Sequence, residues 1–294
     1  MELTKIYYTD HVWYLPERIA FDFGFFENHK LNVELVKFDP TSTENPDLFE
    51  RDNLKGFLSG EVGIYSACTW GTIQRVHDSR IGKVAIKRGI AMNTPYKIFV
   101  AKESQAKMLQ DLSSSKIAIK NLSGSHYITL EAIEEFFTNP TNRLVHVGAV
   151  GKRLSALING NVEAATLVGP SCTIAELLGF RSIHTMPTGG ALVTSRHMNS
   201  EKVGKYISAL NDAVSYINQS PNDVRTVLEE IAAIEFAEIS DVSEIPFESV
   251  LEKLEVPKYD SQFSIADPNE ISKTVQWMSN HNFLPKDIDF EFII

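Results

Sequence analysis

The stretch Ser123-Gly124-Ser125-His126-Tyr127 joins two segments with different hydrophobic patterns. The apolar run before it, residues 116–120, is typical of a strand, whereas residues 126–137 place apolar side chains at helical spacing. The stretch is therefore expected at a strand-to-helix turn. The first amides of a helix lack internal partners, and the helix dipole adds partial positive charge there.

This expected turn is a candidate anion site. Its helix carries no acid before Glu131, so the amides near its start are free to face a small anionic or strongly polar ligand. Gly124 lets a ligand approach the backbone closely, and the neighbouring serines supply hydroxyl donors. We therefore predict ligand contacts at Ser123, Gly124, Ser125 and His126. The structural alternative is that Ser123 or Ser125 only caps the helix.

The length and charge of the chain limit its class. At 294 residues it exceeds one typical core and suggests two lobes. Its 43% hydrophobic and 22% charged residues are ordinary for a soluble globular protein. The net charge of −10 argues against a nucleic-acid partner and against binding to an anionic membrane surface. Any anion site must therefore be local, built from helix ends.

Neither a metal nor a cofactor is expected. The two cysteines, Cys68 and Cys172, lie far apart, and the eight histidines are scattered without an HExxH motif. No GxGxxG or Walker-type loop is present, and no run of 18 apolar residues predicts a membrane span. No signal-like segment precedes the first strand, so we expect a cytoplasmic protein. The alternative is an exported protein whose signal has been removed.

Alternating strand and helix patterns run along most of the chain. Strands are predicted at residues 3–8, 32–38, 61–66, 83–90, 96–102, 116–120, 144–147, 164–168, 181–185 and 191–195. Helices are predicted at residues 16–27, 69–77, 105–112, 126–137, 152–159, 171–178, 201–219, 221–237, 246–254 and 269–281. A polar loop is expected at residues 45–59.

This order predicts an α/β fold with two lobes. Turn-rich joins near residues 92–95 and 187–190 separate the two batches of strands and helices. We therefore predict a discontinuous lobe one (1–94 and 190–294, with the C-terminal helices) and a continuous lobe two (95–189). Two crossings between the lobes would form a hinge, and a ligand would bind in the cleft beyond the carboxyl ends of the strands.

Several segments follow the order and spacing of a known family. They are residues 20–36, with the pattern A…GFFE…L.VELV, residues 58–64, residues 123–127 and residues 157–165. On these segments, and over roughly residues 3–220, the chain resembles type II periplasmic binding proteins. The resemblance is to the branch that holds sulfonate-, taurine- and nitrate-binding proteins and fungal thiamine-pyrimidine synthase-like proteins. It implies that two lobes close on a small-molecule ligand.

The resemblance also implies where ligand contacts lie, because this family uses its strand-to-helix turns for binding. The additional candidates from these turns and the hinge are His11, Trp13, Tyr14, Ser66, Cys68, Thr69, Trp70, Asn93 and Gly169. We predict that at least one ring among Trp13, Tyr14 and Trp70 stacks on a planar ligand group; the alternative is packing at the cleft rim. Asn93 has the alternative of a plain turn residue.

Some segments depart from the family patterns. Residues 67–70 replace the Gly-Asp-x-Pro-like pattern of sulfonate binders, which argues against an alkanesulfonate. The cysteine-rich motif and the substrate histidine of the pyrimidine synthases are both missing. Transporter-linked members carry a signal or lipid anchor that this sequence lacks, which argues against a transporter partner.

Two other functional classes stay open. Cys68 at a helix start has the environment of a reactive thiolate, and His126 could face it across the cleft as a base. The alternatives are a small buried cysteine and a histidine at a helix cap. A protein-interaction role would use the acidic segment 41–52 or the apolar tail 290–294.

We expect a solute-binding-like protein for a small polar or anionic metabolite. A thiamine-pyrimidine precursor, a sulfonate and a phosphate ester are the candidate ligands. The alternative is a desulfinase, decarboxylase or pyrimidine-synthase-like enzyme that uses Cys68 or His126.

Overall fold

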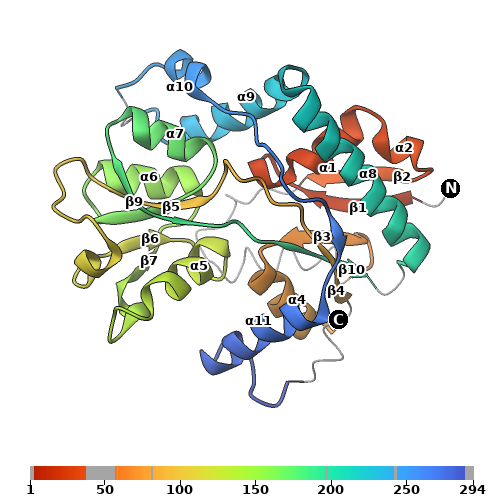
Figure 1. Cartoon of the computed structure of the whole chain (residues 1–294), viewed down its shortest axis with the longest axis horizontal. Coiled ribbons are helices and arrows are strands. Elements are labelled where there is room, and N and C mark those ends of the chain that lie inside the picture. The colour runs from red at the N-terminus through yellow and green to blue at the C-terminus, as the bar shows by residue number, and fades with distance from the viewer. Residues whose placement is uncertain are drawn as a thin grey trace.

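The computed structural model of the chain describes residues 3–37, 57, 59–80, 82–195, 198–241 and 244–288. In this part of the chain the strands form two sheets, with helices packed around them (Figure 1). Most of the loop expected at 45–59, the acidic segment 41–52 and the tail 290–294 lie outside the described residues.

The first sheet has the strand order β11-β4-β10-β3-β1-β2. Its strands are β1 (Leu3–Tyr8), β2 (Asn32–Lys37), β3 (Ile64–Ala67), β4 (Gly82–Lys87), β10 (Ala191–Ser195) and the short β11 (Ser264–Ile265). The helices nearest to it in the chain are α1 (Leu15–Asp22), α2 (Phe25–Asn28), α4 (Thr69–Ser79), α8 (Ser200–Gln219) and α11 (Pro268–Asn280). Strand β1 runs parallel to β2 and β3, whereas β10 lies antiparallel between β3 and β4.

The second sheet has the order β7-β6-β8-β5-β9. Its strands are β5 (Tyr96–Val100), β6 (Ile117–Ile119), β7 (Leu144–His146), β8 (Ala164–Leu167) and β9 (Arg181–Met186). The helices within this stretch are α5 (Gly124–Ile133), α6 (Val150–Ile158) and α7 (Pro170–Leu177). Strand β6 is parallel to β7 and β8, and β5 lies antiparallel between β8 and β9.

The C-terminal helices contact both halves of the molecule. Helix α9 (Pro221–Ala237) packs against α8 on one side and against α6 and α7 on the other, and α10 (Phe247–Lys253) packs on α7. Ile239 and Val250 belong to the same apolar core as strands β5 and β8. The lobe boundaries at 94/95 and 189/190 stay a prediction, and the C-terminal helices join the two sheets.

Three predicted elements differ from the structure for local reasons. The helix expected at 16–27 is split into α1 and α2, because Gly24 has a φ of 73° in the left-handed region. The helix expected at 105–112 is only a 3-10 turn, Leu109–Leu112. Asp111 accepts the backbone N–H groups of Lys107 and Met108, at 2.7 and 3.1 Å, so these amides are satisfied outside a helix.

Helix α5 is shorter than the predicted 126–137 and begins two residues earlier. Its last residue is Ile133, so Phe136 leaves the apolar face on which the sequence placed it and is 43% exposed. Among the helices of the described ranges, none combines the length and hydropathy needed to cross a bilayer.

Candidate functional site

A pocket of about 220 Å³ lies where the turns after strands of both sheets meet. We call it the inter-sheet pocket. Turns after β1, β3, β6 and β8 contribute to its lining, together with residues of α6 and α9. The carboxyl ends of parallel strands are the usual binding edge of α/β sheets, so this pocket is the candidate site.

Most of the predicted contact residues line this pocket. They are His11, Trp13, Tyr14, Ser66, Cys68, Ser123, Gly124 and Ser125. Five others lie outside its lining: Thr69, Trp70, Asn93, His126 and Gly169. Ligand contact by any of the thirteen stays a prediction, but the structure brings the first group together from three separate turns, after β1, β3 and β6.

Trp70 and His126 belong to an aromatic cluster beside the pocket. The Trp70 ring stacks on Tyr127 with centroids 5.8 Å apart, and His126 stacks on the same tyrosine at 5.3 Å. Nδ1 of His126 also accepts the backbone N–H of Leu122 at 3.1 Å. These contacts give both side chains a packing role, and His126 does not share the described lining with Cys68.

A buried ion pair fixes the wall formed by the turns after β1 and β3. Arg88 and Glu17 are 4% and 0% exposed, and Nη1 of Arg88 lies 2.6 Å from Oε1 of Glu17. The same guanidinium donates to Oγ of Ser66 at 2.5 Å and to the carbonyl oxygen of Trp13. Tyr14 donates its hydroxyl to the carbonyl of Ser66 at 2.7 Å. The polar atoms of this wall therefore mainly hold the two turns in place.

The opposite wall is the start of α5. Ser123 holds the N-cap position with extended backbone, but within the described residues its side chain makes no capping bond. Its hydroxyl donates instead to the carbonyl of Lys120 at 2.8 Å, and Oγ of Ser125 accepts the Lys120 N–H at 3.0 Å. The amides of Gly124 and Ser125 have no hydrogen-bond partner in the described part of the chain. The start of α5 therefore keeps donors for a ligand.

The two walls approach each other closely at Gly124. A Cβ atom at this position would lie 2.7 Å from the Tyr96 hydroxyl and 3.3 Å from Cβ of Cys68, so a side chain is excluded. Cys68 is the N-cap of α4, and its Sγ accepts the Gly71 N–H at 3.3 Å. The thiol that the sequence singled out therefore lies at the junction of the walls and is 7% exposed.

Arg153 is a pocket residue that the sequence analysis missed. It projects from α6 and is 4% exposed. Nε donates to the carbonyl of Thr166 at 2.8 Å and Nη1 to that of Gly148 at 3.0 Å. No carboxylate of the described residues forms an ion pair with it. Burial lowers the pKa of Arg153 from its usual range, and the charges of Glu235 and Glu238 oppose this shift without cancelling it.

Glu235 on α9 is the second missed residue and is also 4% exposed. Its Oε2 accepts the N–H of Ser171 at 3.0 Å and the hydroxyl of Ser171 at 2.7 Å. Its Oε1 has no hydrogen-bond partner among the described residues. Burial is the main cause that raises the pKa of Glu235 to about 7. Glu238, one turn further along, accepts the backbone N–H groups of Gly151 and Lys152.

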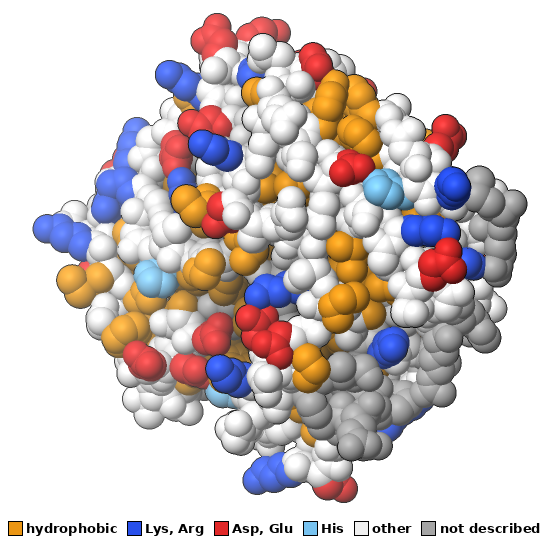
Figure 2. All heavy atoms as spheres, turned by 45° about the vertical axis from the view of Figure 1, so that its right-hand side comes forward, with side chains coloured by type: hydrophobic (Ala, Val, Ile, Leu, Met, Phe, Trp, Pro, Cys, Tyr) orange, Lys and Arg blue, Asp and Glu red, His pale blue; other side chains and the backbone are white. Residues whose placement is uncertain are grey.

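Carboxylates thus occupy the starts of α6 and α7, whereas the start of α5 is open. The pKa of His11 reflects the positive charge around the pocket. Burial lowers it, together with the charges of Arg153, Lys120 and Arg88, to about 3. Acidic and basic side chains are interspersed over the face drawn in Figure 2. The positive charges that act on His11 are those of the nearby Arg153, Lys120 and Arg88.

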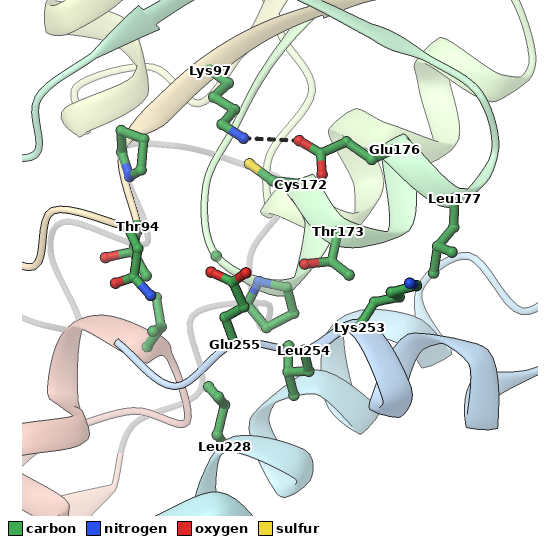
Figure 3. A pocket seen from close by; sticks show the side chains of 15 residues that line it. Thr94, Lys97, Cys172, Thr173, Glu176, Leu177, Leu228, Lys253, Leu254 and Glu255 are labelled. Carbon is green, nitrogen blue, oxygen red and sulfur yellow. Dashed lines mark hydrogen bonds and ion pairs between the residues drawn. The ribbon is translucent and has the colours of Figure 1, made fainter. Parts of the chain in front are cut away.

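A second pocket of about 410 Å³ lies beside β5 and α7 (Figure 3). Asn93 and Gly169 line it, and Lys97 forms an ion pair with Glu176 at 2.8 Å. The Asn93 side chain donates to the Val256 carbonyl at 3.0 Å, as expected for a turn residue. Lys253 also lines this pocket, together with a second carboxylate, Glu255. Because the two lysines share the described lining with two carboxylates, the inter-sheet pocket is the better candidate for an anion.

In the described residues no group of three or more histidine, cysteine or acidic side chains is arranged to hold a metal ion. No family model matches the sequence, and a search of curated proteins finds no significant match.

Solved structures are similar over the whole chain. The periplasmic aliphatic sulphonate binding protein SsuA from Escherichia coli has a TM-score of 0.75 at 16% identity, covering 100% of this chain and 92% of that one. The chain has the type II periplasmic-binding-protein fold. The Candida albicans CA3427 gene product, described with the generic form of this fold, has a TM-score of 0.65 at 14% identity and covers 99% of this chain and 93% of its own. The predicted fold class is thereby confirmed.

Proposed function

We propose that this protein captures a small anionic metabolite in the inter-sheet pocket. The observation that carries the proposal is Arg153, a guanidinium that lines the pocket, is 4% exposed and has only backbone carbonyls as partners in the described structure. A buried charge without a counter-charge is costly, and a bound anion would supply the counter-charge. Guanidinium groups suit phosphate and sulfonate because they donate two parallel bonds.

The opposite wall supports the same ligand class. The unpartnered amides of Gly124 and Ser125 offer donors at the positive end of α5. The charge of Lys120 adds to the potential that depresses the pKa of His11. Three of the similar structures are named as sulfonate-binding proteins, and one of them contains bound MOPS. A sulfonate or phosphate ester is therefore our first candidate.

The size and aromatic lining of the pocket restrict the rest of the ligand. The pocket has a volume of about 220 Å³. The Trp13 ring lies 6.2 Å from that of Tyr96, and both line the pocket. A planar ring such as a pyrimidine could stack on these aromatic side chains, which keeps a thiamine-pyrimidine precursor among the candidates.

The proposal is tested by identifying what the purified protein carries. Mass spectrometry of the small molecules released on denaturation should find an acid that binds again to the stripped protein with a one-to-one stoichiometry. Thermal shift and calorimetry with alkyl phosphates and sulfonates provide an independent test. The proposal is wrong if neither a released molecule nor any acid of the series binds. Turnover of the released molecule that is lost in Cys68→Ala would instead establish the enzyme hypothesis.

A further inference from the structure

We propose that the second pocket, beside β5 and α7, is a separate binding site for a small neutral molecule that has an apolar body and one hydroxyl or amide group. Its occupant strengthens the binding of an anion in the inter-sheet pocket. The second site itself is independent of the proposed function, whereas the coupling between the two pockets rests on it.

The second pocket has the size and the enclosure of a ligand site. Its volume of about 410 Å³ exceeds the 220 Å³ of the inter-sheet pocket. Small-molecule sites typically span roughly 300–1,000 Å³. Helices α7, α9 and α10 pack on one another and all contribute to the lining, as does the join before β5.

The floor of this pocket is apolar. Val12, Leu228 and Leu254 belong to one apolar cluster and are 5%, 1% and 5% exposed. Pro95 and Pro170 add two apolar rings to the lining. Transfer of an apolar ligand body from water onto this surface is therefore favourable.

The rim of the pocket carries charges that balance. Its two cations are Lys97 and Lys253, and its two anions are Glu176 and Glu255. Lys97 is paired with Glu176 at 2.8 Å, whereas Lys253 and Glu255 are exposed to solvent. A charged ligand group would lose hydration here without a buried counter-charge, so the lining favours a neutral ligand.

Two polar side chains of the rim can orient such a ligand. Neither the Thr173 hydroxyl nor the Glu255 carboxylate has a hydrogen-bond or ion-pair partner among the described residues. Figure 3 shows Thr173 on α7 and Glu255 on the segment after α10, on facing sides of the pocket. Threonine donates or accepts, and a carboxylate accepts. A hydroxyl or amide group, which combines a donor with an acceptor, matches both side chains.

The two pockets share a wall. Val12 and Gly169 line the second pocket, and their chain neighbours Trp13 and Val168 line the inter-sheet pocket. Gly169 has a φ of 67°, and a Cβ atom there would lie 3.0 Å from Cγ1 of Val12, so the turns after β1 and β8 touch. A ligand packed against this contact holds both turns in place, which lowers the ordering cost of binding an anion on the other side. Linkage makes the effect reciprocal.

The ligand class is tested with probes of similar shape. At pH 7 benzyl alcohol is neutral, benzylamine is cationic and benzoate is anionic. In leucine-methyl NMR spectra, Leu228 and Leu254 report on the second pocket and Leu122 reports on the inter-sheet pocket. Benzyl alcohol should shift Leu228 and Leu254 to saturation and bind at least about fivefold tighter than either charged probe. This comparison uses the native protein and makes no assumption about the folding of a variant.

Thr173→Trp then assigns the binding to the second pocket. The indole occupies the space beside α7, so benzyl alcohol should no longer shift Leu228. Thr185→Trp is the matched control, because Thr185 is exposed on the edge strand β9 and lies outside both linings. The control variant should bind benzyl alcohol as the native protein does.

The coupling is measured by calorimetry with ethyl phosphate. The native protein should bind ethyl phosphate about fivefold tighter or more when benzyl alcohol is saturating. In Thr173→Trp, benzyl alcohol should have no such effect. An unchanged affinity in the native protein would overturn the coupling and leave the second site standing.

The remaining outcomes separate the second site from the proposed function. Shifts confined to Leu122, or tighter binding of a charged probe at Leu228, would overturn the neutral-ligand site. The same holds if benzyl alcohol shifts none of these leucines, or shifts Leu228 equally in Thr173→Trp. A native protein that binds no ethyl phosphate would contradict the anion site and the coupling, while the NMR result still decides the second site.

Discussion

The guanidinium of Arg153 and the carboxylate of Glu235 line one pocket without pairing with each other. They project from α6 and α9, which approach each other closely at Gly151. A Cβ atom at Gly151 would lie 2.8 Å from the Glu235 carbonyl oxygen and 2.4 Å from Oε2 of Glu238. The contact between the two helices therefore fixes where both charges stand before any ligand arrives, which lowers the ordering cost of binding.

Replacement of Arg153 by methionine should weaken the binding of phosphate or sulfonate probes by roughly 30-fold or more. Loss of one partner from a buried charged contact costs about 2–5 kcal/mol. Lys152→Met removes an exposed charge from the adjacent position and should have little effect. Calorimetry with the tightest-binding probe measures both. An equal loss of affinity in the two variants would mean that Arg153 acts only through its long-range charge and does not contact the ligand.

An acid at the start of α5 should repel the ligand. Ser125→Asp places a carboxylate beside the unpartnered amides, whereas Ser125→Asn has the same size and no charge. Both variants lose the Oγ that accepts the Lys120 N–H, so the difference between them isolates the charge. We expect the aspartate variant to bind at least about tenfold more weakly than the asparagine variant. Identical affinities would contradict an anion at this turn.

The titration of Glu235 should lower stability as the pH rises. Its pKa moves from 4.5 when unfolded to about 7 when folded, so the folded state holds the proton more tightly. This contribution is fully present below pH 4.5, is lost as the pH passes 7, and amounts to on the order of 3 kcal/mol. The groups that face the Glu235 carboxyl are Arg153, Glu238 and the two donors of Ser171. None of these residues is altered in the variant used for the test.

The measurement is urea unfolding of the ligand-free protein at several pH values. Relative to the native protein, Glu235→Gln should gain stability steadily between about pH 5 and pH 8, because glutamine does not titrate. A constant difference between the two proteins over this range would show that Glu235 has an ordinary pKa.

Variants of two tryptophan residues distinguish a ligand contact in the pocket from packing outside it. Trp13 lines the inter-sheet pocket, whereas Trp70 is stacked on Tyr127 outside it. The ligand-induced fluorescence change should therefore disappear in Trp13→Phe and persist in Trp70→Phe. Stacking on the ligand contributes about 0.5–1.5 kcal/mol beyond the burial of area, so the loss of stacking accounts for up to roughly tenfold of the weaker binding expected for Trp13→Ala. The same fluorescence change in all proteins, with unaltered affinity, would leave the stacking prediction without support.

The fold could be predicted from the sequence because its strands are short apolar runs that end at turn residues. Helices α9 and α11 also begin at prolines, which are favourable at a first helical position. The failure at 105–112 has a different origin, since the Asp111 side chain competes for backbone amides. Hydrophobic periodicity does not register such local competition.

The sequence contains a signal for the two buried charges of the pocket, Arg153 and Glu235. Arg153 lies at helical spacing with the buried residues Val150, Leu154 and Leu157, and so occupies the apolar face of α6. Glu235 continues the buried stripe of α9 in the same way. An ionisable residue on an apolar stripe indicates a buried charge. Its partner could not be predicted, because the contact of Glu235 with Ser171 joins residues 64 apart and depends on how α9 docks.

The end of α11 ties the two halves of the molecule together. Helix α11 packs on α4, and Glu134, the residue directly after α5, accepts the Trp277 indole N–H at 3.1 Å and lies 2.6 Å from Nε2 of His281. A motion that separates the sheets at this edge would have to break these two contacts, which we call the clasp. A clasp that forms equally in the empty and the loaded protein would leave the equilibrium affinity unchanged and would slow entry and escape by the same factor. Its consequence would then be a longer residence time of the ligand.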